Sequence, residues 1–253
     1  MILNVNEFSY FIRDRKFLSY NFSRLRGPYL EKMFKKLLII FIFSYSLCVY
    51  SKPFIKKATF GGGCFWCMEP PFEEVPGVIS VISGFMGGVI KNPSYKVVAS
   101  GKTSHKEVVQ IRFDSEIVSY QSLLNIFWQN IDPTDSFGQF VDRGPQYAPV
   151  IYFHGETQKL LAEKSKNKLS KLNIFSKKIT VPILRAKISH PTEDYHQDYY
   201  KKSALKYKYY RYRSGRDQFL KKAWYGKSIY QSPYDKKTLK KKLTPIQYKV
   251  TQE

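Results

Sequence analysis

The chain has 253 residues, of which 43% are hydrophobic and 25% are charged, and it carries a formal net charge of +22. This composition is typical of a globular protein and excludes a collagen-like or wholly disordered chain. The positive charge favours anionic partners in general, but the basic residues are dispersed and no nucleic-acid-binding motif accompanies them, so we expect no nucleic-acid partner.

An apolar segment near the start of the chain resembles a secretory signal. It runs from Leu37 to Tyr50 and follows Lys35 and Lys36. A membrane-spanning helix needs about 20 apolar residues, so the segment is short for one, whereas it fits the apolar region of a signal peptide. Val49 and Ser51 would place the cleavage site after Ser51.

The residues before this segment need a separate explanation. Met33 stands just before the basic residues, so we hypothesise that translation starts there; the alternative is a cytosolic arm on an uncleaved anchor. We expect an exported, periplasmic or membrane-associated protein if residues 33–51 act as a signal, and a cytoplasmic one otherwise. The predicted organisation is an N-terminal extension (1–51), one mixed domain (52–226) and a Lys-rich tail (227–253).

The central sequence alternates between strand and helix patterns. Strands are predicted from β-branched or alternating runs, and helices from apolar residues at helical spacing. The predicted strands are 56–61, 78–85, 105–113, 150–153 and 179–188, the last at a sheet edge because it contains Pro182. The predicted helices are 64–74, 119–130, 156–172 and 194–202. The fold class is therefore mixed α and β.

Three glycines lead directly into a Cys-x-x-Cys pair. Gly61, Gly62 and Gly63 precede Cys64, and Cys67 follows one helical turn later. Glycines allow a sharp turn and a close approach to the backbone. A thiol at the start of a helix is stabilised as the thiolate, which predicts a pKa below the free value of about 8.5. Such a thiolate is a nucleophile, and a neighbouring thiol can condense with the sulfenic acid that it forms.

Other interpretations of the Cys pair remain open on pattern alone. A zinc site needs four ligands, and no second Cys pair exists, although His190 and His196 come close to a zinc spacing. The pair also fits a thioredoxin-like redox site or a structural disulfide. Phe65 and Trp66 between the cysteines favour a pocket for a small apolar group such as a methyl. We expect no metal.

The predicted strand 105–113 places a carboxylate on an apolar face. Glu107 alternates with Val109, Ile111 and Phe113 on one side of the strand. Desolvation there would raise the pKa of its carboxyl, and a protonated carboxyl at neutral pH is a proton donor. The alternative places Glu107 at the wet end of the strand, beside Lys106.

A stretch without clear periodicity runs from Asp135 to Tyr147. Long loops in compact domains are often functional. Asp142 could accept hydrogen bonds there and Tyr147 could donate them, although on pattern alone ordinary turn residues are the simpler interpretation.

The segment Gly63-Cys64-Phe65-Trp66 closely resembles the signature of the peptide methionine sulfoxide reductase A family. Further segments resemble blocks of this family in the same order, and the resemblance extends from about Lys57 to Tyr225. These segments are 84–88, 105–109, 132–135, 142–147, 194–200 and 214–219. Several ordered blocks over this length make a chance match very improbable.

The resemblance implies an α+β fold, a two-layer sandwich with a ferredoxin-like core and a mixed β-sheet. It implies an oxidoreductase that reduces the S epimer of methionine sulfoxide, free or protein-bound, and so repairs oxidised proteins. Cys64 would be the attacking cysteine, and Glu107 would protonate the sulfoxide oxygen. The implied substrate-binding residues are Phe65, Trp66, Phe85, Asp142 and Tyr147.

Two departures from the family pattern matter. The family commonly has Tyr at the position of Phe85, so a hydroxyl is missing, which predicts a weaker site by about 0.5–1.5 kcal/mol. No cysteine follows Cys67, so Cys67 must form the disulfide with Cys64, or an external thiol must do so. A thioredoxin or thioredoxin-like protein would then reduce the disulfide. No cofactor is implied. We expect a monomer that contacts membranes only through the signal segment.

Two other functions stay open at this point. One is a general thiol–disulfide oxidoreductase of the Cys-x-x-Cys type. The other is a basic surface-binding protein in which the Cys pair is structural.

Overall fold

A six-stranded sheet organises residues 54–224, the part of the chain that the computed structural model describes. The strand order is β7-β6-β1-β3-β2-β8, and neighbours are antiparallel except β6 and β7, which are parallel. The strands are β1 (Ile55–Gly61), β2 (Val78–Met86), β3 (Lys106–Asp114), β6 (Val150–Phe153), β7 (Ile183–Arg185) and β8 (His190–Pro191). A separate hairpin consists of β4 (Gly138–Gln139) and β5 (Asp142–Arg143).

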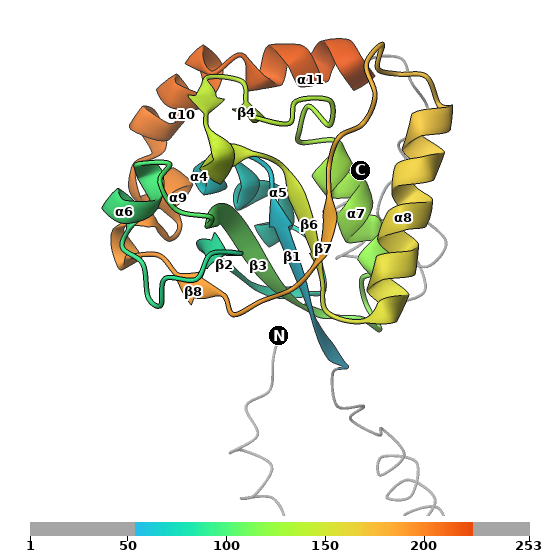
Figure 1. Ribbon diagram of the computed structural model, residues 1–253, viewed down its shortest axis with the longest axis horizontal. Helices are drawn as coiled ribbons and strands as arrows, with labels where there is room; N and C mark the ends of the chain where they lie inside the picture. The colour runs from blue at the N-terminus through green and yellow to red at the C-terminus, as the bar shows by residue number, and fades with distance from the viewer. Residues whose placement is uncertain (1–53, 225–253) are drawn as a thin grey trace, which may run out of the picture. The chain divides into compact units, whose positions relative to one another are not determined.

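The helices connect these strands and cover the sheet. They are α4 (Phe65–Met68), α5 (Pro70–Glu73), α6 (Tyr95–Ala99), α7 (Tyr120–Trp128), α8 (Glu156–Lys171), α9 (Tyr199–Lys202), α10 (Ala204–Arg213) and α11 (Arg216–Trp224), with the 3₁₀ turns η1 (Pro145–Tyr147) and η2 (Asp194–His196). The order β6-β1-β3-β2, with α4 and α5 before β2 and α7 before β6, is the ferredoxin-like arrangement. The predicted α+β class is therefore confirmed. Figure 1 shows α7 and α8 side by side next to the sheet, and α10 and α11 near the end at which α4 lies.

Strand β3 is covered on both of its faces. Val109 and Ile111 belong to the main core, whereas Val108 belongs to a smaller cluster with Met86 and Val150. Successive side chains of a strand point to opposite faces, which explains why two clusters form on one strand. The apolar face that the sequence predicts is thus the face toward the main core.

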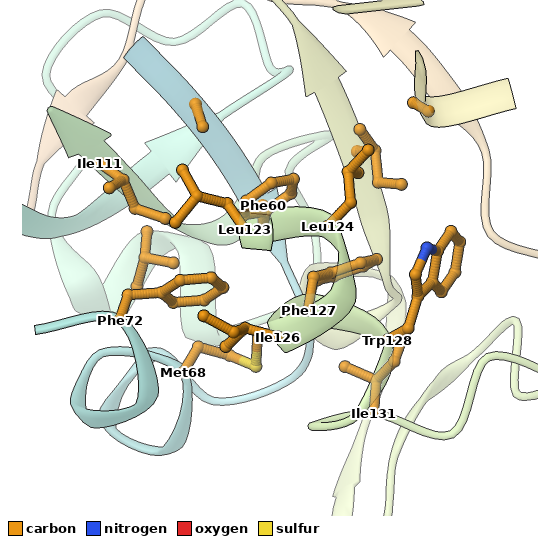
Figure 2. Packing of buried hydrophobic residues seen from close by; sticks show 14 of the residues in the cluster. Phe60, Met68, Phe72, Ile111, Leu123, Leu124, Ile126, Phe127, Trp128 and Ile131 are labelled. Carbon is orange, nitrogen blue, oxygen red and sulfur yellow. The ribbon is translucent and has the colours of Figure 1, made fainter. Parts of the chain in front are cut away.

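The main core is built around aromatic side chains (Figure 2). The fully buried Phe60 ring of β1 lies 5.5 Å from the Phe72 ring of α5 and 5.0 Å from the Phe127 ring of α7. Leu123 and Leu124 of α7 are also fully buried, as their helical spacing predicts. Burial of such a side chain stabilises the fold by about 1.5–3 kcal/mol, so this core fixes β1 and the turn that follows it.

The predicted helix 64–74 is wrong as a single element, because it is divided into α4 and α5. Pro70 and Pro71 have no backbone N–H, so they cannot donate to the carbonyls of Trp66 and Cys67, four residues earlier. The Cys67 carbonyl instead accepts a hydrogen bond from the Arg211 side chain over 3.2 Å. The segment that carries Cys64 and Cys67 is therefore a single helical turn.

The predicted helix 194–202 is divided as well. Asp198 has a left-handed backbone (φ 54°) between η2 and α9, and its N–H donates to Glu69 Oε2 over 3.1 Å. The predicted strand 179–188 is shorter than expected, Ile183–Arg185, but it lies at the sheet edge as predicted.

Three predictions fall outside the described residues: the signal-like segment, the start at Met33 and the Lys-rich tail. Within residues 54–224, no helix has the length and apolar character needed to cross a membrane.

Candidate active site

Cys64 lies at the junction between β1 and α4. Its side chain is 7% exposed, and it occupies the N-cap position of α4. Gly63 before it has a left-handed backbone (φ 87°), and a Cβ there would lie 2.7 Å from both Arg216 Nη2 and Gln139 Cβ. Glycine is therefore required at position 63, for its backbone conformation and for the space that it leaves.

The pKa of the Cys64 thiol is raised well above its ordinary value, which makes the predicted lowering wrong. Burial is the main cause, and the carboxyl of Glu107, the Cys67 thiol and Asp142 raise the pKa further. The Tyr210 hydroxyl opposes this rise by a hydrogen bond. The one-turn helix α4 contributes too small a dipole to compensate, because the macrodipole builds up over several turns. Cys64, when it is not in a disulfide, is therefore a protonated thiol at neutral pH.

Glu107 lies beside Cys64 on the core face of β3. Its side chain is buried, and its Oε2 accepts a hydrogen bond from the backbone N–H of Phe65 over 3.0 Å. Burial raises the pKa of Glu107 to about 8, and Asp142 adds to this rise, whereas the Phe65 N–H opposes it. Of the two predicted positions for Glu107, the structure thus has the buried one, where the carboxyl is a proton donor at neutral pH.

Asp142 and Tyr147 form a polar end of the site. Asp142 Oδ2 accepts a hydrogen bond from the Tyr210 hydroxyl over 2.6 Å, and burial raises the pKa of Asp142. The Tyr147 hydroxyl lies close enough to Tyr95 of α6 to oppose the rise that burial causes in the pKa of Tyr95. Glu107 and Cys64 both lie close enough to raise the pKa of Tyr147. The loop 135–147 therefore does bring both predicted residues to the thiol.

Aromatic rings line the other side of the site around Cys64. The Trp66 ring stacks on Tyr199 at 3.7 Å with 11° between the planes, and its indole N–H donates to His196 Nδ1 over 3.2 Å. The Phe65 ring lies 6.0 Å from Phe85. Such an apolar surface beside a thiol and a neutral carboxyl suits a small neutral group that carries a polar oxygen.

Cys67 belongs to the same turn as Cys64. Its N–H donates to the Cys64 carbonyl over 3.0 Å, and both cysteines are buried free thiols. Burial raises the pKa of Cys67, whereas the guanidinium groups of Arg216 and Arg211 oppose this rise. The described residues contain no cluster of His, Cys, Asp or Glu that could hold a metal ion.

A sequence profile of the family described as peptide methionine sulfoxide reductase matches residues 56–228. The chain belongs to the peptide methionine sulfoxide reductase family. The predicted resemblance is thus confirmed, and neither a general thiol–disulfide oxidoreductase nor a basic surface-binding protein is favoured by this relationship.

Individual relatives agree with this family assignment. The peptide methionine sulfoxide reductase MsrA of Listeria monocytogenes is 49% identical over 176 residues, which cover 70% of this chain and 99% of that protein. The MsrA/MsrB protein of Vibrio cholerae is 44% identical over 218 residues, which cover 78% of this chain but only 57% of that protein. The chain thus matches little more than half of the Vibrio protein.

Two solved structures have the same fold. Methionine sulfoxide reductase A of Corynebacterium diphtheriae superposes with a TM-score of 0.54 and 31% identity, over 61% of this chain and 78% of that chain. Reduced Mxr1 from Saccharomyces cerevisiae superposes with a TM-score of 0.56 and 26% identity, over 59% and 86%.

Several residues that lie at the site were not assigned from the sequence. They are Tyr95, His196, Tyr199, Tyr210 and Arg216. Tyr95 matters most for the predicted weakness at Phe85, because its ring, which carries a hydroxyl, comes from a different element and lies 6.1 Å from the Phe65 ring between centroids. His196, Tyr199 and Arg216 lie in the segments 194–200 and 214–219 that resemble family blocks, but the resemblance assigned them no role at the site.

Proposed function

We propose that this protein reduces the S epimer of methionine sulfoxide, free or within proteins, to methionine and thereby repairs oxidised proteins. The observation that carries the proposal is the pairing of a buried thiol, Cys64, with a carboxyl, Glu107, whose pKa of about 8 keeps it protonated at neutral pH. Membership of the peptide methionine sulfoxide reductase family supports the same reaction.

The first step transfers the sulfoxide oxygen to Cys64. Glu107 donates its proton to this oxygen, which makes the sulfoxide sulfur electrophilic. The Cys64 sulfur bonds to the sulfoxide sulfur, and its thiol proton passes to the Glu107 carboxylate. The hydroxyl then moves from the substrate sulfur to the Cys64 sulfur as the bond between the two sulfurs breaks, so that methionine leaves and Cys64 holds the oxygen as sulfenic acid.

Substrate recognition is assigned to both sides of the thiol. Phe65, Trp66 and Phe85 would contact the methyl group attached to the sulfoxide sulfur. Asp142 and Tyr147 would bind the polar end. The rings are held by contacts within the fold, such as the Trp66–Tyr199 stack, so they require little reorganisation when substrate binds.

The second step regenerates the enzyme. The Cys67 thiol condenses with the Cys64 sulfenic acid, which forms a disulfide and releases water. A thioredoxin or a similar dithiol protein would then reduce this disulfide to two thiols. The position of Cys67 in the same turn as Cys64 supports this role.

We propose that the protein is exported from the cytosol. The apolar run Leu37–Tyr50 behind Lys35 and Lys36 supports it. An exported enzyme would repair exported proteins and would need a reductant at that location. N-terminal sequencing of the natural protein tests this proposal, and a mature protein that begins near Met1 would contradict it.

Turnover of the two sulfoxide epimers tests the activity itself. With dithiothreitol as reductant, the parent should convert the S epimer to methionine and leave the R epimer, and Cys64→Ser should convert neither. Reduction of protein disulfides without any conversion of methionine sulfoxide would instead support the thiol–disulfide oxidoreductase.

A further inference from the structure

Two arginine side chains, one from α10 and one from α11, reach the turn that carries Cys67. Arg216 of α11 donates from Nη2 to the Gly62 carbonyl over 3.0 Å, and its Nη1 lies 3.8 Å from Met68 Sδ. Arg211 of α10 donates from Nη1 to the Cys67 carbonyl over 3.2 Å. The two guanidinium groups thus contact the segment on both sides of Cys67.

The sequence of the segment makes room for both groups. Pro71 lacks the N–H that would occupy the Cys67 carbonyl in a continuous helix, which leaves this oxygen to Arg211. Gly63 lacks the Cβ that would lie 2.7 Å from Arg216 Nη2. The Cys pair and the two arginines therefore form one packed unit.

The charge of Arg216 has no carboxylate partner among residues 54–224. Its side chain is fully buried and donates to the Gly62 and Asn130 carbonyls and to Met68 Sδ, and its Cζ lies 4.7 Å from the centroid of the Phe140 ring, while its Nε has no hydrogen-bond partner. A buried cation without a carboxylate partner is unfavourable. A negative charge that forms beside it would be stabilised strongly, because a buried site screens charges poorly.

Charged groups of both signs influence the pKa of Cys67. Arg216 lowers the pKa of Cys67 most and Arg211 next, whereas Asp142 and Asp217 raise it. Arg211 also forms an ion pair with Asp217, with 2.7 Å between Nη2 and Oδ1. The uncharged titratable groups that interact with Cys67 are Cys64, Tyr207 and Tyr210.

We propose that Arg211 and Arg216 are positioning residues that activate Cys67 for disulfide formation by stabilising the negative charge on its sulfur. This inference rests on the proposed function, because it assumes that Cys67 attacks the Cys64 sulfenic acid. In that step the Cys67 thiol loses its proton and its sulfur bonds to the Cys64 sulfur. The Cys64 S–O bond breaks, and the departing hydroxide takes up the proton and leaves as water.

Arg211→Gln in the full chain tests the proposal, with Arg213→Gln as the matched control. Arg213 lies on the same helix with an exposed side chain, so its replacement removes one charge away from Cys67. Each protein is mixed with one equivalent of methionine sulfoxide without reductant from pH 6 to 9. Methionine reports the Cys64 step. The sulfenic acid trapped by a 1,3-diketone and the disulfide report the Cys67 step.

We expect Arg211→Gln to form methionine at the parent rate within about twofold. Disulfide formation should slow by about five- to tenfold at pH 7, which corresponds to a rise of about one pH unit in the midpoint of this step. Because burial already raises the pKa of Cys67 above its ordinary value, the slowing should persist up to pH 9. Arg213→Gln should match the parent at each pH.

Two results would overturn the inference alone: an unchanged rate of disulfide formation in Arg211→Gln, or a rate in Arg211→Lys, which retains the charge, that is as slow as in Arg211→Gln. A second variant, Arg216→Lys, retains the buried charge and should keep the parent's pH midpoint; a shifted midpoint would also count against the inference. If sulfenic acid persists in the parent as long as in Cys67→Ser, the role of Cys67 itself fails, and the inference fails with it.

Discussion

The backbone N–H of Phe65 donates to Glu107 Oε2 over 3.0 Å, which ties the first residue of α4 to β3. This bond fixes the carboxyl next to the thiol that precedes Phe65 in the chain. It also leaves the second carboxyl oxygen, Oε1, without a backbone partner, so that this oxygen can carry the proton. The proposed proton donor and nucleophile are therefore positioned by the same turn.

Glu107→Gln should lower kcat/KM for methionine sulfoxide by about 10²- to 10⁴-fold at pH 7, because the amide keeps the shape of the side chain but has no proton to donate. In the parent, kcat/KM should fall above about pH 8 as Glu107 ionises. This fall should be absent from the variant. Glu74→Gln, an exposed side chain near the same segment, is the control and should match the parent. A parent profile that is flat to pH 9 would contradict the assignment.

The same variant should change stability in a pH-dependent way. Below about pH 4.3 the carboxyl is protonated in both the folded and the unfolded protein. Between that pH and about 8 the unfolded chain releases the proton but folded Glu107 retains it, so the free energy of unfolding decreases as pH rises. Glu107→Gln avoids this loss.

Chemical unfolding at pH 4 and pH 8.5 measures this effect. The parent should lose a few kcal/mol more than Glu107→Gln between the two values, as an order of magnitude. An equal change in both proteins would show that Glu107 does not carry a raised pKa in the folded state.

The hydroxyls of Tyr95 and Tyr147 should support activity as a pair. Tyr95→Phe and Tyr147→Phe should each lower kcat/KM by about two- to tenfold, since a neutral hydrogen bond contributes about 0.5–1.5 kcal/mol. The double variant should lose less than the product of the two factors, because the residues interact directly. Tyr209→Phe, with a 69% exposed side chain, serves as the control. Strictly multiplicative losses would argue against a coupled pair.

Gly63→Ala should lower both the free energy of unfolding and the activity. The backbone there has a φ of 87°, and the added Cβ would lie 2.7 Å from Arg216 Nη2 and Gln139 Cβ. The expected loss is about 1–3 kcal/mol or more. Gly155→Ala is a matched control, because nothing lies within 4 Å of a Cβ at that position. Equal unfolding curves for the two variants would contradict this account of Gly63.

Local patterns predicted the central part of the fold well. The alternation in 105–113 placed Glu107 and Ile111 on the face toward the main core, and the spacing of Leu123 and Phe127 placed α7 on that core. These predictions depend only on the period of a strand or a helix. The continuous helix 64–74 was wrong because the effect of Pro70 and Pro71 outweighed the helical pattern.

The electrostatics of the site could not be predicted in the same way. The pKa of Cys64 depends on its burial and on carboxyl groups from distant segments, whereas the sequence prediction used only the helix that follows it. Tyr210 reaches Asp142 across 68 residues of sequence, and Arg216 reaches Gly62 across 154. No local pattern contains such contacts, because they arise only when α10 and α11 pack against α4.

The central claim is that the Cys64 sulfur takes the oxygen from methionine sulfoxide. The Cys67→Ser variant tests this claim most directly, because a sulfenic acid formed on Cys64 then finds no second thiol within the motif. After one turnover without reductant, in the presence of a 1,3-diketone, mass spectrometry of the digested protein should find one adduct on Cys64 for each methionine released. Methionine formed in equal amount with Cys64 unmodified would contradict the account.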